Sequence, residues 1–246
     1  MPRTNWSEEE LKKALILYCI LPFGKMHAKN PDIIDLAGKI GRSPNAVAMK
    51  LVNFASLDPN LKKRGIKGLS NLSHLDKKVW ADFSGHWTAS VEVNLDADIL
   101  RKIELLSKNS EGTAQVKTRK VQSFFRKAVL SSYNESCCIC KLSHPRLLCA
   151  SHIIPWSDDE SNRANPSNGL CLCAIHDRAF DQGLITIDEN YCVTGSNELR
   201  AEKSGKVCET YFENFIGREI TLPDKFLPNQ VFLKHHRENI FRVTTK

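Results

Sequence analysis

Side chains that suit chemistry on a phosphodiester are concentrated between positions 149 and 184. In chain order they are His152, Asn168, the adjacent pair His176 and Asp177, and the segment Phe180-Asp-Gln-Gly183. A neutral imidazole can take a proton from water near pH 7, and carboxylate oxygens bind hard divalent ions such as Mg²⁺. Taken alone, His152 could be a structural histidine of a strand, and Asn168-Gly169 could be a plain turn. As one ordered set, they indicate metal-assisted hydrolysis.

A second group of residues has the spacing of zinc ligands. One Cys-x-x-Cys and one Cys-x-x-His supply the four side chains Cys137, Cys140, Cys173 and His176. Two such pairs on tight turns favour a tetrahedral structural zinc ion, which would stabilise a unit too small for a large core. Cys138 and Cys171 compete for these positions, and the alternative interpretation is a set of free buried cysteines.

These motifs resemble the HNH endonuclease family, and within it a bacterial restriction-type branch with a Ser-His-Ile and Asn-Gly-Leu signature. The signature is read here in CASHIIPW, from Cys149 to Trp156, and in NGL, from Asn168 to Leu170. The resemblance covers about residues 117 to 195 and implies a ββα-metal fold. The sequence fits this layout, with strands expected at Arg146 to Ile154 and Gly169 to Cys173 and a helix at about Ala174 to Gln182.

The resemblance also implies roles for individual residues. His152 would be the general base, and Asn168 would fix the loop or help to bind the ion. The family's last histidine often falls nine positions after this asparagine, which is Asp177 here, whereas His176 falls eight positions after it. If His176 binds zinc, Asp177 binds the catalytic ion. Otherwise His176 itself binds the catalytic ion.

One position departs from many members of that family. Ser151 stands where they carry an Asp or His ligand, and a hydroxyl is a poor ligand. Asp181 or a phosphate oxygen could compensate, and the Ser-His-Ile branch shares the serine. The departure also motivates an alternative function, a catalytically inactive zinc-stabilised DNA-binding regulator.

The N-terminal third predicts three amphipathic helices. The first follows the cap residue Ser7, the second follows Asn30-Pro31 and ends near Gly41, and the third follows Ser43-Pro44. The last two have helix-turn-helix spacing, which predicts that Arg42, Asn45 and Lys50 face outward and contact DNA. A three-helix packing unit with a glycine turn is an equally good interpretation.

The middle of the chain contains the expected domain boundary. Short helices are expected at Leu75 to Phe83 and Asp96 to Ser107, followed by a striped helix from Arg119 to Tyr133. The polar side of that helix carries Arg119, Lys120, Arg126 and Lys127, which could contact DNA or simply face solvent. We therefore expect a helical domain at 1–90, a linker at 91–117 and a nuclease domain at 118–246 with its core at 133–195.

Composition sets broader bounds. The chain has 246 residues, 41% hydrophobic and 26% charged, with a formal net charge of +7 that favours a polyanionic partner. Nine cysteines and an N-terminus without a signal-peptide pattern predict a reducing, cytoplasmic location. The apolar run from Ala14 to Phe23 is too short to cross a bilayer, so no membrane partner is expected. The adjacent His235 and His236 are assigned to surface or phosphate contact.

The predicted fold class is α+β, with a helix-turn-helix-like domain followed by a zinc-braced ββα-metal HNH module. The predicted function is hydrolysis of double-stranded DNA by a Mg²⁺- or Mn²⁺-dependent endonuclease with structural Zn²⁺, in the restriction of foreign DNA. One module cuts one strand, so a double-strand break would need a homodimer. The alternatives are the inactive regulator and an HNH nuclease that acts on modified DNA or RNA.

Overall fold

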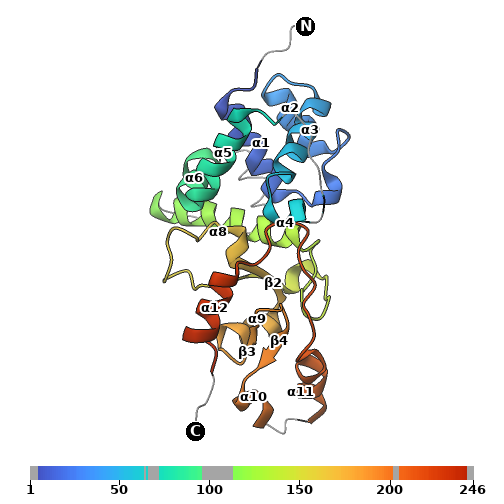
Figure 1. Cartoon of the computed structure of the whole chain (residues 1–246), viewed down its shortest axis with the longest axis vertical. Coiled ribbons are helices and arrows are strands. Elements are labelled where there is room, and N and C mark those ends of the chain that lie inside the picture. The colour runs from blue at the N-terminus through green and yellow to red at the C-terminus, as the bar shows by residue number, and fades with distance from the viewer. Residues whose placement is uncertain (1–4, 64, 66–71, 96–112, 202–204, 243–246) are drawn as a thin grey trace.

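The chain folds as a helical unit and a strand-containing module that share one long helix (Figure 1). The computed structural model describes residues 5–63, 65, 72–95, 113–201 and 205–242. The helix expected at Asp96 to Ser107, and most of the predicted linker, lie outside the described residues.

The helices of the N-terminal unit begin at the capping residues that the sequence indicates. Ser7 and Glu10 form a reciprocal capping box. The Asn30 side chain accepts a hydrogen bond from the backbone N–H of the second residue of its helix, and the Ser43 side chain accepts one from that of the third. Gly41 follows the second helix with φ of 65°, a backbone conformation that favours glycine. The helices are α1 (Glu8–Ile20), α2 (Pro31–Lys39), α3 (Pro44–Ala55), α4 (Pro59–Lys63), α5 (His74–Gly85) and α6 (Trp87–Asn94), with the 3₁₀ turn η1 (Phe23–Lys25).

Two of the three residues predicted to face outward near α3 do not. Lys50 is only 8% exposed, and its Nζ pairs with both carboxylate oxygens of the buried Asp76 at the start of α5, at 2.8 and 2.9 Å. The Arg42 side chain is 12% exposed, binds both carboxylate oxygens of Glu10 and lies over the Trp6 ring. The prediction that Arg42 and Lys50 face outward is therefore wrong, because both hold helices of the unit together. Asn45 is exposed as expected.

The shared helix is α8 (Thr113–Ser132), which crosses the molecule between the two units in Figure 1. Val121, Phe124 and Ala128 on one side of it belong to the core of the helical unit. Phe125 and Val129, each one position further along, belong to the core of the module. The predicted apolar stripe thus serves two cores at once, which fixes the module against the helical unit.

Polar groups of α8 bind neighbouring backbone. Lys120 donates to the Leu95 carbonyl at 3.2 Å, and Arg119 is half-buried.

Lys225, far along the chain, is fully buried and donates to three carbonyls at the end of α1, those of Tyr18, Cys19 and Leu21. This lysine satisfies backbone acceptors that helix geometry leaves open and ties the C-terminal segment to the helical unit.

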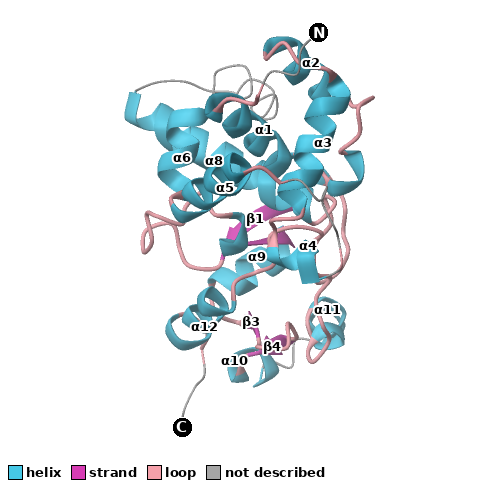
Figure 2. Ribbon diagram, turned by 45° about the horizontal axis from the view of Figure 1, so that its top comes forward, coloured by secondary structure: helices cyan, strands magenta, loops and turns pink. Residues whose placement is uncertain are grey.

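The module contains the predicted pair of strands followed by a helix. β1 (Leu148–His152) pairs antiparallel with β2 (Gly169–Cys173), and β1 lies near the middle of the molecule in Figure 2. The register of the pair places His152 opposite Gly169. β2 leads directly into α9 (Ala174–Asp181). The 3₁₀ turns η2 (Pro145–Leu147) and η3 (Pro166–Asn168) precede the two strands. This confirms the ββα order and the bounds of the second strand.

The rest of the module follows α9 in the chain, with β3 packed against α9 and α12 packed against β3. Its elements are the hairpin β3 (Ile185–Ile187) and β4 (Val193–Gly195), α10 (Asn197–Ala201), α11 (Gly205–Tyr211), η4 (Glu213–Phe215) and α12 (Gln230–Asn239). His236 is 1% exposed, stacks on Phe180 and bonds Thr186 Oγ1 and the Phe180 carbonyl. The assignment of His236 to the surface is therefore wrong. No helix in the described part of the chain is long and apolar enough to cross a membrane.

Candidate active site and metal centre

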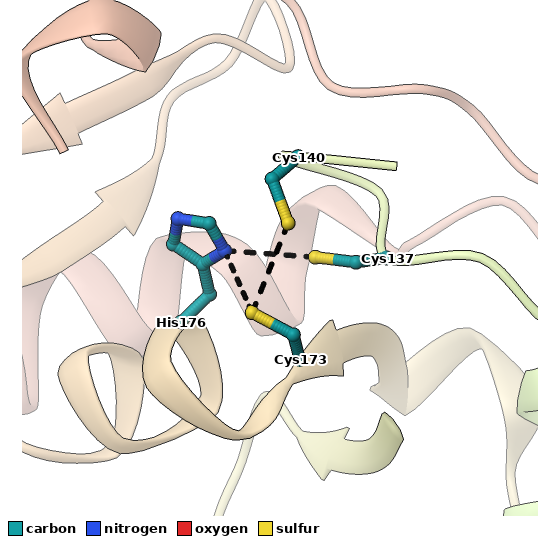
Figure 3. Close-up of side chains that lie close together, drawn as sticks. All are labelled: Cys137, Cys140, Cys173 and His176. Carbon is teal, nitrogen blue, oxygen red and sulfur yellow. Dashed lines mark hydrogen bonds between the residues drawn. The ribbon is translucent and has the colours of Figure 1, made fainter. Parts of the chain in front are cut away.

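Four side chains from the two ends of the ββα unit converge on one point. The predicted zinc ligands Cys137, Cys140, Cys173 and His176 have their ligand atoms within 4.8 Å of one another, and three of them are buried. Figure 3 shows the three sulfur atoms and the imidazole turned toward each other. Cys138 and Cys171, which the spacing left as competitors, lie outside this cluster.

The distances within the cluster match a tetrahedral zinc site. With Zn–S bonds of about 2.3 Å and Zn–N bonds of about 2.0 Å, tetrahedral geometry separates two sulfurs by about 3.8 Å and a sulfur from a nitrogen by about 3.5 Å. Cys140 Sγ lies 3.8 Å from Cys173 Sγ, and His176 Nδ1 lies 3.6 Å from Cys137 Sγ and 3.2 Å from Cys173 Sγ. The donor set therefore fits Zn²⁺ in both chemistry and size.

A hydrogen bond to backbone sets the His176 tautomer that suits a zinc ligand. Its Nε2 lies 2.7 Å from the Tyr211 carbonyl, which can only accept, so Nε2 carries the proton and Nδ1 is left with a free lone pair. The hydrogen bond from Cys137 lowers the pKa of the Cys173 thiol, against the effect of burial. The same contact and burial raise the pKa of the Cys137 thiol, and burial raises that of Cys140, so Cys173 is the sulfur most readily present as the thiolate that binds metal.

His176 and Asp177 are adjacent in the sequence, but their side chains belong to two different sites. Consecutive residues of a helix project about 100° apart, so His176 turns to the cysteines while Asp177 lines a separate cleft. Both ring nitrogens of His176 are engaged, and His176 is not among the residues that line the cleft. The alternative in which His176 binds a catalytic ion does not fit this geometry.

The cleft has a volume of about 580 Å³ and lies between β1, α9, α8 and α12. Its charged and polar lining residues are Arg126, Cys149, Ser151, His152, Asp177, Asp181 and His236. Asp177 and Asp181 are four residues apart on α9 and so share one face of the helix. The cleft thus brings the predicted base together with two carboxylates.

The His152 imidazole is held on three sides. Its ring stacks on Phe125 with centroids 3.6 Å apart and meets the edge of Trp156 at 5.5 Å. Nε2 lies 3.0 Å from the Arg163 carbonyl, so Nε2 is the protonated nitrogen and Nδ1 is the basic one. Burial lowers the pKa of His152, which keeps the imidazole neutral and able to accept a proton at pH 7.

The acidic side of the cleft has the features of a cation site. Burial and, second to it, the Asp177 carboxylate raise the pKa of Asp181 to about 6, while Arg178 and the Ser151 hydroxyl act in the opposite direction. Ser151 is 3% exposed, and its Oγ has no hydrogen-bond partner of good geometry among the described residues. A divalent cation would relieve the repulsion between the carboxylates and satisfy the hydroxyl, so the residues present fit such an ion.

Asn168 braces the loop that follows His152. Its Oδ1 accepts from the Ile154 N–H at 2.8 Å, and its Nδ2 donates to the Ile154 carbonyl at 3.2 Å. With the amide used in this way and absent from the cleft lining, Asn168 does not fit the role of an ion ligand. The geometry agrees with the other expectation, that Asn168 fixes the loop.

Gly169 has a steric reason to follow Asn168. A Cβ at this position would collide with Val129 Cγ2 and would lie 2.9 Å from Phe125 Cζ. The absence of a side chain opposite His152 on the paired strand therefore lets α8 approach and lets the Phe125 ring lie flat on the imidazole. Asn168 thus fixes the loop that follows His152, and Gly169 leaves room for the ring that stacks on the imidazole.

Several residues of the site were missed by sequence reasoning. Phe125 was assigned to an apolar stripe, and the carbonyls of Arg163 and Tyr211 have no sequence signature at all. Arg126 lines the cleft while donating to the Leu148 carbonyl at 2.9 Å. Unlike the others, Arg126 was within reach of sequence reasoning, because it is one of the basic residues on the polar side of that helix that could face DNA.

Comparison with protein families supports this site. Residues 137–188, which are 52 of the 246 in the chain, match the family model of HNH endonucleases. The match spans the Cys₃His cluster, β1, β2, α9 and β3, and therefore includes His152 and the two carboxylates of the cleft. The chain contains an HNH domain, which supports a nuclease of the HNH type. A comparison with curated proteins gave no match.

Proposed function

We propose that this protein is a metal-dependent DNA endonuclease in which His152 is the general base. The observation that carries the proposal is the cleft itself, where a neutral, clamped imidazole faces two carboxylates within a segment that matches HNH endonucleases. That combination suits hydrolysis of a phosphodiester by activated water.

His152 Nδ1 takes the proton from the attacking water. The Phe125 ring and the Arg163 carbonyl hold the imidazole, so little orientational freedom is lost when the reaction begins. A base of this kind typically contributes about 10² to 10⁴ in rate. Asn168 acts one step further away, by fixing the backbone that carries the base.

Asp177, Asp181 and the Ser151 hydroxyl are the groups that would hold the catalytic ion. When bound, Mg²⁺ or Mn²⁺ supplies charge stabilisation for the phosphate and the leaving oxygen. The second carboxylate, Asp181, compensates for the ligand that the family often has at position 151. The Cys₃His cluster takes Zn²⁺ and serves the fold, because all four of its ligand positions come from protein.

Double-stranded DNA is the substrate that we propose, in the restriction of foreign DNA inside the cell. The net charge of +7 favours a polyanion, and Arg126 places a guanidinium at the cleft wall where a phosphate would lie. Asn45 and Arg119 are the remaining candidates for DNA contacts on the helical unit and α8. One cleft cuts one strand, so a double-strand break requires two copies of the chain.

The test is nicking of supercoiled plasmid and of phage DNA by zinc-loaded protein with Mg²⁺, Mn²⁺ or neither ion. Asp177→Asn removes a carboxylate from the cleft, and Asp158→Asn changes an exposed carboxylate in the following loop as the matched control. We expect cutting that needs the ion, falls at least a hundredfold in Asp177→Asn and is unchanged in Asp158→Asn. DNA binding without cutting under any ion would refute the nuclease and favour the regulator.

A further inference from the structure

A second cavity, of about 450 Å³, lies between the helical unit and the module. Its walls come from the start of α4, from α5 and α6, from η3, and from the segment that leads into α12. Cavities of about 300 to 1,000 Å³ are typical of small-molecule sites in proteins. The nuclease chemistry does not use this cavity.

The lining suits a flat, uncharged ligand. Trp80, Trp87, Tyr191 and Phe226 contribute aromatic surface, with the Trp80 and Phe226 rings within 9° of parallel. No Lys, Arg or His is among the described residues that line the cavity. Its one carboxylate, that of Asp58, is buried and accepts from the backbone N–H groups of Asn60 and Phe226. A phosphate would find no cation here, whereas a heterocycle would find π-faces and amides.

Two further observations mark the cavity as a built site. Tyr191 and Phe226 have φ angles of 60° and 54°, a left-handed conformation that is an outlier for bulky side chains. Such strain tends to persist at ligand clamps. In addition, Gln230 Oε1 is buried without a hydrogen-bond partner among the described residues, although its Nε2 donates to the Glu189 carbonyl. A buried acceptor of this kind calls for an N–H donor.

Two elements of the structure link the cavity to the cleft. Asn165 and Ser167, at one wall, belong to the same turn as Asn168, which braces the loop after His152. Helix α12 starts at the cavity with Gln230 and reaches the cleft with His236, six residues and about 9 Å further along its axis. This distance is about two to three base-pair steps of 3.4 Å along one DNA strand.

We propose that this cavity binds one nucleobase, extruded from the DNA strand that lies in the cleft. The aromatic walls would stack on the base, and the Gln230 side chain, once rotated so that Oε1 faces the cavity, would accept from its ring N–H or exocyclic amine, as in other proteins that read a flipped base. The claim that the base comes from DNA in the cleft rests on the proposed nuclease function. The preference for a neutral heterocycle rests on the cavity alone.

The variant Ser84→Phe fills the cavity from α5, where Ser84 is a half-buried lining residue. Gln230→Leu removes the unpaired acceptor at nearly constant volume. Ala81→Phe adds the same side chain at an exposed position on the same helix and is the matched control. Circular dichroism and zinc content verify that each variant is folded.

The first measurement is binding of free deoxynucleosides by ligand-observed NMR, without added Mg²⁺ or Mn²⁺. We expect at least one deoxynucleoside to bind wild type and Ala81→Phe, and its affinity to fall at least tenfold in Ser84→Phe and in Gln230→Leu. The corresponding 5′-monophosphate should bind no more tightly, because the lining offers no cation. Absence of nucleoside binding to wild type, or equal binding to Ser84→Phe, would overturn the site.

The second measurement identifies the source of the base. A duplex with one unpaired nucleotide should bind wild type at least tenfold more tightly than the fully paired duplex, since extrusion is then cheaper. Ser84→Phe should abolish this preference. If nucleosides bind but duplex preference is unchanged in Ser84→Phe, the DNA base is refuted and a free nucleoside is the ligand. If deoxynucleosides bind and the duplex with an unpaired nucleotide is preferred, but plasmid is not nicked, the endonuclease proposal is refuted and the base-binding site stands.

Discussion

Replacement of Asn168 by alanine should damage stability and catalysis together, for reasons that can be worked from its contacts. Asn168 is 1% exposed and satisfies both the N–H and the carbonyl of Ile154, two residues after the base. A buried backbone group left without its partner costs about 1 to 3 kcal/mol. With two such groups, we expect Asn168→Ala to lower the free energy of unfolding by about 2 to 6 kcal/mol.

The same change releases the loop on which His152 is mounted. We expect kcat for plasmid nicking to fall at least tenfold while KM for DNA stays nearly constant, because Asn168 supports the base and lies outside the cleft lining. Urea unfolding of the zinc-loaded protein gives the stability change. Nicking rates are then measured at a temperature where both proteins are folded.

Asn53 provides the matched control for this prediction. It is also a buried asparagine, at 6% exposure, but its Oδ1 has no hydrogen-bond partner among the described residues and it lies on α3, in the helical unit. Asn53→Ala should therefore cost less than Asn168→Ala and leave kcat unchanged. Equal stability and full nicking activity in Asn168→Ala would show that the brace does not position the base.

Three further outcomes are expected. Purified protein should contain one zinc ion per chain by atomic absorption, and Cys173→Ser should lose the ion and lower the unfolding temperature; zinc-free protein of unchanged stability would contradict this. Burial lowers the pKa of His236 from 6.5 to about 4. As the pH falls, the unfolded chain therefore takes up a proton on His236 before the folded protein does. Stability should fall by up to about 3 kcal/mol between pH 6.5 and 4, and His236→Asn should lose this dependence in urea unfolding. Gly169→Ala should cost about 1 to 3 kcal/mol by the same method, since its Cβ collides with Val129 and Phe125.

The elements of the site were predictable because local signals agree with the final fold. The capping side chains Ser7, Asn30 and Ser43 mark helix starts through contacts within three residues. The continuous apolar run of β2 and its direct passage into α9 are equally local. The zinc ligands were found because two short pairs carry a spacing that one ion requires.

Features that depend on distant partners were not predictable. Lys50 was expected to face solvent because nothing in α3 reveals that Asp76, 26 residues later, lies against it. His236 was misplaced for the same reason, since its partners Thr186 and Phe180 precede it by about fifty residues. The mount of His152 depends on a backbone carbonyl and on a phenylalanine from another element, and neither leaves a motif.

The central claim, that His152 is the base of a nuclease, is tested most directly by one variant. His152→Ala is compared with His235→Ala, which removes a histidine from α12 that does not line the cleft. In single-turnover nicking of plasmid with saturating Mg²⁺, we expect His152→Ala to be slower by about 10² to 10⁴ and His235→Ala to match wild type. Undiminished nicking by folded, zinc-loaded His152→Ala would contradict the account.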